Sequence, residues 1–221
     1  TALFLTWRYA GGTELRRLLR RAVIWHVSLV WYLIAIAGPA LIMLLATSIH
    51  VLLGGTIPDY VPFGVRWLIV VVNFILILLI GGPLGEEFGW RGLALPSLEA
   101  RFSPLWASLI LGVIWAVWHL PLFFISGSAQ SSLPFGLYAL LTIPLTILIT
   151  WVYHGSGNSL LLAMLFHAAV NTWSGPLMIS PEAAGSTRPL VLGVILTWLI
   201  ALLVVVGRRR ARFQKEKLEN E

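Results

Sequence analysis

Cysteine is absent from the 221 residues, and charged residues make up only 11% of them. The lack of thiols excludes disulfide scaffolds, iron–sulfur sites, cysteine-based zinc sites and thiol nucleophiles. Soluble proteins carry roughly 25% charged residues, so this chain has too few charges to cover a water-facing surface. Aspartate occurs once, at Asp59, far from the other polar motifs, which leaves a Ser/His/Asp triad without an acid.

Several common catalytic motifs are also missing. No phosphate-binding glycine loop, Gly-x-Ser-x-Gly element or His-Glu-x-x-His zinc-protease helix is present. The chain begins at Thr1 rather than Met, so we expect that further sequence precedes it.

Apolar residues dominate instead, at 58% of the chain, with 11 Trp, 10 Phe and 5 Tyr. Aromatic side chains of this kind concentrate at membrane–water interfaces, and a transmembrane helix needs about 20 apolar residues. The sequence therefore predicts an all-α, polytopic membrane helical bundle in one integral membrane domain, 1–221, with a basic tail at 208–221. About six transmembrane helices are expected, at 22–53, 66–95, 104–125, 133–153, 158–175 and 187–207.

Two of these spans look irregular. The first carries Gly38-Pro39 near its middle, which predicts either one kinked, tilted helix or a helix followed by a re-entrant turn. The clean apolar run of the second, 66–80, is too short to cross a membrane. It must continue through the glycine-rich stretch 81–85 into a charged segment.

The basic residues predict the orientation. With six spans both termini lie on one side, and 13 of the 15 Lys and Arg fall on that side, leaving Arg66 and Arg188 opposite. The positive-inside rule then makes the chain a multi-pass cell-membrane protein with both termini cytosolic. The net charge of +6 is therefore explained by topology and by lipid headgroups as partners, and no nucleic-acid partner is expected.

Ionisable residues within spans are costly and point to function. In Gly85-Glu86-Glu87-Phe88-Gly89-Trp90-Arg91, Glu87 and Arg91 are four apart on a helix and predict a local ion pair. Glu86 projects about 100° away from Glu87 and is free to face another group. The alternative is a helix end that emerges among the headgroups, a reading we accept for Glu99 and Arg101.

Two further motifs carry polar groups into the bundle. Glu86 and His119 are equidistant from the expected turn near 101–104, so an antiparallel hairpin places them at one height in the cytosolic half of the membrane. His167 and Asn171 are four apart and share a helical face, where two donors could stabilise an oxyanion. Taken alone, the histidine of either motif is better explained by hydrogen bonds that hold helices together.

Together, Glu86-Glu87-x-x-x-Arg91, Trp115-x-x-x-His119 and His167-x-x-x-Asn171 resemble the CAAX protease and bacteriocin-processing (CPBP/Abi) family of intramembrane endopeptidases. These are related to the type II CAAX prenyl endopeptidase. The resemblance covers roughly 66–175, which we expect to be the catalytic core. It differs at Trp115, where Phe is usual, and in showing six spans where the prenyl endopeptidases have eight.

The resemblance implies a cytosol-facing intramembrane cavity in which Glu86 activates water with the help of His119. His167 and Asn171 then form the oxyanion hole, while Glu87 and Arg91 have a structural, ion-pairing role. The implied substrate is a membrane-associated peptide or lipidated protein. No cofactor is required, although Glu86, His119 and His167 would be the ligands if zinc were used. The alternative is a non-catalytic membrane scaffold or bacteriocin-immunity protein that uses the same cavity for binding.

Overall fold

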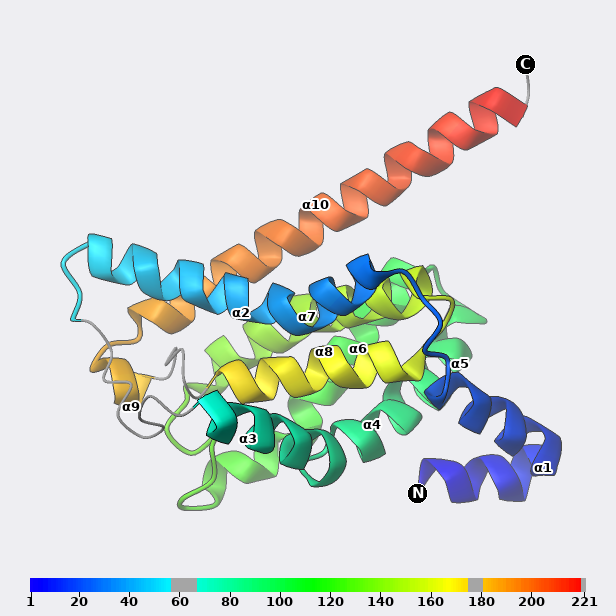
Figure 1. The fold of residues 1–221 in the computed structure, drawn as a ribbon, viewed down its shortest axis with the longest axis horizontal. Coiled ribbons are helices and arrows are strands. Elements are labelled where there is room, and N and C mark those ends of the chain that lie inside the picture. The colour runs from blue at the N-terminus through cyan, green and yellow to red at the C-terminus, as the bar shows by residue number, and fades with distance from the viewer. Residues whose placement is uncertain (57–66, 175–180, 220–221) are drawn as a thin grey trace.

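The computed structural model describes residues 1–56, 67–174 and 181–219, so Asp59 and Arg66 lie outside the described residues. All regular structure in these ranges is helical (Figure 1), which confirms the all-α prediction. The α-helices are α1 Ala2–Ala22, α2 Leu29–Leu52, α3 Trp67–Ile80, α4 Pro83–Gly89, α5 Leu95–Glu99, α6 Pro104–Trp118, α7 Phe135–Gly155, α8 Leu160–Trp173, α9 Pro181–Ala184 and α10 Arg188–Glu219. A π-helical turn, η2 Trp90–Ala94, joins α4 to α5, and a 3₁₀ turn, η3 Leu120–Phe124, follows α6.

Five helical stretches are long and apolar enough to cross a membrane. They are Leu29–Leu52, Val70–Glu99, Pro104–Phe124, Phe135–Gly155 and Arg188–Arg208, and they make this a multi-pass membrane protein. The fifth predicted span corresponds to α8, which is apolar but has only 14 residues. Most of the α8 side chains are buried, and the helix contacts α2, α3, α4 and α7. It forms the centre of the bundle.

The N-terminal region differs from the prediction. The first span begins at Leu29 rather than at 22, because residues 2–22 form a separate helix, α1, which the sequence analysis did not anticipate. Gly11 kinks α1 with a φ of 83°, a conformation that side chains other than glycine rarely adopt. Helix α2 continues through Pro39, so the single-helix alternative for this span holds.

The second span continues past its short apolar run into the charged segment, as predicted. It is interrupted between α3 and α4. Gly82 has a φ of 111°, which ends α3 because this region of backbone conformation is unfavourable for any residue with a Cβ. Pro83 then starts α4, a position where the missing N–H of proline costs nothing. This break places Glu86 in the first turn of α4.

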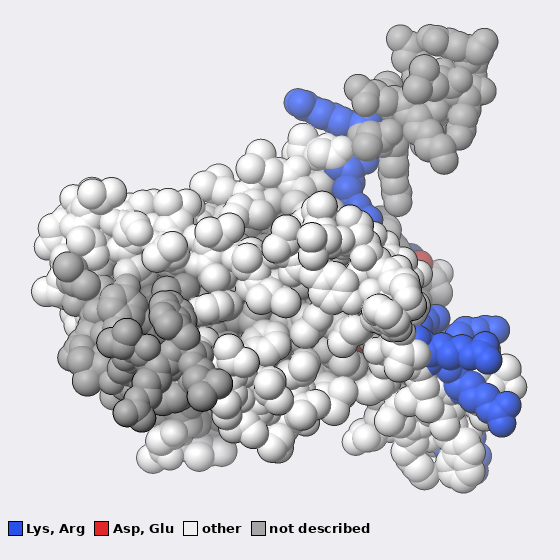
Figure 2. Space-filling model, in the orientation of Figure 1, with Lys and Arg blue, Asp and Glu red and all other residues white. Residues whose placement is uncertain are grey.

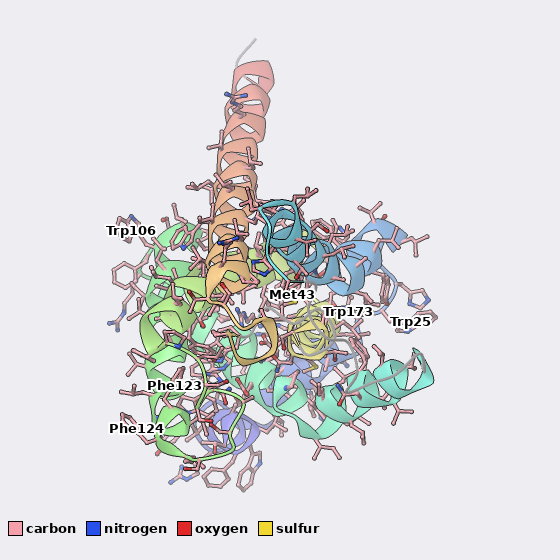
Figure 3. All side chains as sticks on the ribbon, turned by 90° about the vertical axis from the view of Figure 1, so that its left-hand side faces the viewer. Trp25, Met43, Trp106, Phe123, Phe124 and Trp173 are labelled. Atoms are coloured by element: carbon pink, nitrogen blue, oxygen red, sulfur yellow. The ribbon has the colours of Figure 1, made fainter. Side chains whose placement is uncertain are left out.

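Close packing fixes the neighbouring helices. A Cβ added to Gly112 of α6 would lie 2.9 Å from the Cα of Ile143 in α7, so a glycine is needed where the two backbones approach. On the outside of the bundle, Trp106 and Phe124 point away from the helices and are 61% and 81% exposed, whereas Met43 lies between helices (Figure 3). Large exposed apolar side chains of this kind suit a surface that faces lipid.

The two termini lie at the same end of the molecule (Figure 1). On the face shown in Figure 2, the Lys and Arg side chains gather at that end, on α1 and on the C-terminal part of α10, while the rest of the described surface is almost free of charge. The predicted tail is helical in the structure, because α10 continues without interruption to Glu219.

Candidate active site

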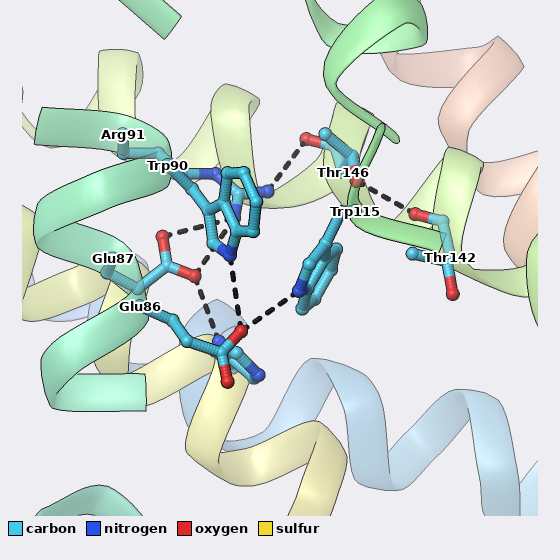
Figure 4. A network of polar contacts seen from close by, with 8 residues as sticks. Glu86, Glu87, Trp90, Arg91, Trp115, Thr142 and Thr146 are labelled. Atoms are coloured by element: carbon cyan, nitrogen blue, oxygen red, sulfur yellow. Dashed lines mark hydrogen bonds and ion pairs between the residues drawn. The ribbon is translucent and has the colours of Figure 1, made fainter. Parts of the chain in front are cut away.

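Glu86 is held by two tryptophans that come from different helices. The indole Nε1 of Trp115 on α6 donates to Glu86 Oε2 over 2.9 Å, and that of Trp90 donates to the same oxygen over 3.2 Å (Figure 4). Hydrogen bonds to a charged group are worth about 1.5–3 kcal/mol each. The two donors therefore fix one oxygen of this half-buried carboxylate.

The other oxygen, Oε1, lies over Gly82. A Cβ added at Gly82 would collide with Glu86 Oε1, so this glycine is required for space as well as for its positive φ. The Glu86 backbone N–H also donates to the Gly82 carbonyl over 2.8 Å. Gly82 thus keeps room beside the oxygen that the indoles leave open.

Glu87 is the centre of a buried polar group. Arg91 Nη1 donates to Glu87 Oε1 and Oε2 over 2.9 and 3.1 Å, and both side chains are fully buried. This is the pairing that the helical spacing predicts. Arg91 Nη2 lies 3.5 Å from the Thr146 carbonyl, so the ion pair also contacts α7. Arg91 belongs to the π-helical turn, a form that occurs frequently at functional sites.

His167 contacts Glu87 rather than Glu86. Its Nδ1 lies 2.9 Å from Glu87 Oε1, and the imidazole is buried at the centre of α8. The paired carboxylate of Glu87 accepts hydrogen bonds only, so Nδ1 carries the proton of this bond. The contact joins α8 to α4 through one acid that also holds Arg91.

His119 is the last residue before η3 and lies one turn beyond Trp115. Its Nδ1 lies 2.9 Å from the Trp115 carbonyl, and a carbonyl only accepts, so Nδ1 donates and the neutral ring keeps its lone pair on Nε2. The Trp115 ring lies 5.7 Å from the His119 ring and 4.9 Å from that of His167, centroid to centroid. Trp115 thus contacts three of the predicted site residues, Glu86, His119 and His167.

Asn171 is the predicted site residue that is least connected. It lies one turn beyond His167 on α8 and is exposed, and its backbone carbonyl accepts from Ser174 Oγ over 2.9 Å. In the described part of the chain, no hydrogen bond joins its carboxamide to Glu86, His119 or His167. The oxyanion role of His167 and Asn171 stays a prediction.

The residues proposed for zinc do not form a ligand set. Within residues 1–56, 67–174 and 181–219, no group of three His, Asp or Glu side chains is arranged to hold a metal ion. Glu86 Oε2 accepts hydrogen bonds from two indoles, and His167 Nδ1 donates to Glu87. The expectation that no cofactor is required stays a prediction. The cavity expected at the site also stays a prediction, because the two cavities described in the structure are not lined by these residues.

Sequence reasoning missed the two indole donors, Gly82 and the contact of His167 with Glu87. Trp90 lies four residues after Glu86, and the i, i+4 rule applied to Glu87 and Arg91 would have found it. The sequence identified Trp115 only as a departure from the usual Phe, whereas its N–H binds Glu86. The contacts of Trp115 with Glu86 and of His167 with Glu87 join different helices, and residue spacing along one helix does not predict them.

Two comparisons with known proteins match this chain. The family described as type II CAAX prenyl endopeptidase Rce1-like matches residues 66–173. The chain is also similar to the protein named CAAX prenyl protease 2 of Methanococcus maripaludis, with 34% identity over 147 residues. That alignment covers 64% of this chain and 52% of the relative, so the chain spans about half the length of the curated relative it matches.

The matched segment holds Glu86, Glu87, His119, His167 and Asn171, the residues on which the sequence resemblance rests. The contacts of Trp115 bring three of them together in space. Through residues 66–173, this chain is similar to the Rce1-like family of type II CAAX prenyl endopeptidases.

Proposed function

We propose that this protein is an intramembrane endopeptidase that cleaves prenylated CAAX-type substrates with water activated by Glu86. The observation that carries the proposal is the fixed carboxylate of Glu86, with two N–H donors on one oxygen and the side-chain-free Gly82 beside the other. The name of the relative, CAAX prenyl protease 2, supplies the substrate class.

Glu86 Oε1 accepts a proton from water, and the resulting hydroxide attacks the carbonyl carbon of the scissile peptide bond. The neutral His119 ring offers its Nε2 lone pair as a second acceptor for the same water, because Nδ1 is occupied by the Trp115 carbonyl. When the tetrahedral intermediate collapses, the proton held by Glu86 passes to the leaving amine.

The oxyanion is stabilised from α8 by His167 and Asn171. His167 Nδ1 already donates to Glu87, so the ring donates from Nε2 only when both nitrogens carry protons. Glu87 accepts from that ring through Oε1, and Arg91 holds both Glu87 oxygens in place. Glu87 and Arg91 therefore position the oxyanion donor and also hold the helices together.

The substrate reaches the site from the membrane. Val70–Glu99 and Pro104–Phe124, which carry Glu86 and His119, are both apolar enough to span the bilayer, so a prenyl chain can approach through lipid. Helix α1 and the C-terminal part of α10 lie at one end of the molecule, where the Lys and Arg side chains visible in Figure 2 gather (Figures 1 and 2), and the positive-inside rule assigns that end to the cytosol. The mechanism uses no cofactor.

The test uses the purified chain in detergent with a quenched, farnesylated CAAX peptide and the same peptide without the farnesyl group. We expect cleavage of the prenylated peptide. Glu86→Gln keeps the size of the side chain and should reduce turnover about 100- to 10,000-fold at an unchanged melting temperature. Glu99→Gln is the matched control, since Glu99 contacts His154 rather than the site residues, and should keep its activity. Binding of the peptide without cleavage would favour the scaffold or immunity alternative.

A further inference from the structure

A second site lies away from Glu86. A cavity of about 180 Å³ is enclosed by the start of α6, the C-terminal half of α7 and the end of the apolar part of α10. Its walls include Leu105, Ile147, Thr150, Val204, Val205 and Arg208. Ser108 of this cavity is seven residues before Trp115 on α6, about 10 Å along the helix axis, so the cavity is separate from the candidate active site.

Thr150, a lining residue of this cavity, has a hydroxyl without a hydrogen-bond partner among the described residues. Thr142 and Thr146 precede it on α7 at intervals of four, and each donates to the carbonyl four residues earlier, over 2.8 and 2.9 Å. The corresponding carbonyl for Thr150 is that of Thr146, which lies against Arg91 Nη2. Thr150 lines the cavity, and its Oγ1 is buried with no hydrogen-bond partner among the described residues. A buried hydroxyl in this state costs about 1–3 kcal/mol, which a ligand with an acceptor would recover.

Arg208 gives the cavity a positive edge. The cavity lies where three spans end together, because Pro104 and Arg208 are the end residues of two spans and Thr150 lies five residues from Gly155 at the end of the third. This is the interfacial level of a bilayer. Arg208 is exposed there and carries five N–H donors, so it can serve a further acceptor beside its existing contact.

We propose that this cavity binds one anionic glycerophospholipid. The lipid phosphate binds Arg208, an acyl ester carbonyl accepts from the Thr150 hydroxyl, and the first methylene groups pack on Val204 and Val205. A volume of 180 Å³ equals that of about six waters, so the cavity takes the ester region and leaves most of the acyl chains in the bilayer. The proposal does not depend on proteolysis by the other site.

The experiment measures lipid binding to the full chain by native mass spectrometry in neutral detergent. The probes are dioleoyl phosphatidylglycerol, dioleoyl phosphatidylcholine and glycerol phosphate. We expect one saturable phosphatidylglycerol, with at least about tenfold weaker binding of phosphatidylcholine. Arg208→Gln should weaken phosphatidylglycerol about fivefold, as expected for one basic residue near an anionic surface. Arg210→Gln, two residues on and outside the cavity lining, is its matched control.

The Thr150 hydroxyl is tested by Thr150→Val, which keeps the shape of the side chain. It should weaken phosphatidylglycerol by about fivefold through one lost hydrogen bond and should not lower the lipid-free melting temperature. Thr142→Val removes a hydroxyl that is already bonded within α7 and should leave lipid binding unchanged. Equal binding of the two lipids, equal effects of Arg208→Gln and Arg210→Gln, or full affinity in Thr150→Val would overturn the proposal. Competition by glycerol phosphate at the same concentration would assign the site to a free phosphate instead.

Discussion

Glu87→Gln is expected to destabilise the fold, because it leaves Arg91 buried without its counter-charge. Both side chains are 0% exposed, and Arg91 Nη1 contacts both Glu87 oxygens. Glutamine keeps the size and still offers one oxygen to His167 Nδ1, so the main loss is the charge opposite Arg91. Removing one partner of a buried ion pair costs about 3–5 kcal/mol.

The assay is thermal unfolding in detergent beside turnover of the quenched peptide. In a chain of this size each kcal/mol shifts the melting temperature by about 2–4 °C, so Glu87→Gln should lose about 10 °C together with activity. Arg91→Gln should lose a similar amount, because it leaves Glu87 buried as an unpaired anion. The double variant with both changes should recover most of the stability, since neither charge is then left alone.

Three results would refute this reasoning. A melting temperature of Glu87→Gln within about 2 °C of the wild type would mean that the pair contributes little net stability. A double variant as unstable as the sum of the single variants would mean that the two residues are not coupled. A stable but inert Glu87→Gln beside an active Glu86→Gln would show that the roles of the two acids are reversed.

Three further outcomes are expected. Trp115→Phe removes the shorter hydrogen bond to Glu86 and should lower kcat about tenfold at a nearly constant melting temperature, from a lost bond to a charged group of about 1.5 kcal/mol. Trp90→Phe, which removes the longer bond, should have a smaller effect, and full turnover in Trp115→Phe would contradict the positioning role. A reporter fused after Glu221 should be cytosolic and one inserted at Asp59 external, and the opposite pattern would overturn the orientation. Activity should survive chelators, and complete loss restored by stoichiometric zinc would count against a metal-free mechanism.

The all-helical membrane fold follows from composition alone. With 58% hydrophobic residues and 11% charged ones, the chain must lie in lipid, where backbone groups are satisfied within helices. The positions of the long spans were therefore predicted to within a few residues, except the first, which starts seven residues later because α1 is separate. The amphipathic α1 has no long apolar run, so hydropathy does not detect it.

Spacing along one helix predicted the pair of Glu87 and Arg91, because residues four apart share a face. The tertiary structure alone decided what Glu86 and Glu87 meet from other helices. Trp115 is 29 positions from Glu86, and His167 is 80 positions from Glu87. Such contacts depend on how helices rotate and approach one another. Packing at small residues such as Gly112 sets that rotation. The periodicity of residues within a single helix does not predict the rotation.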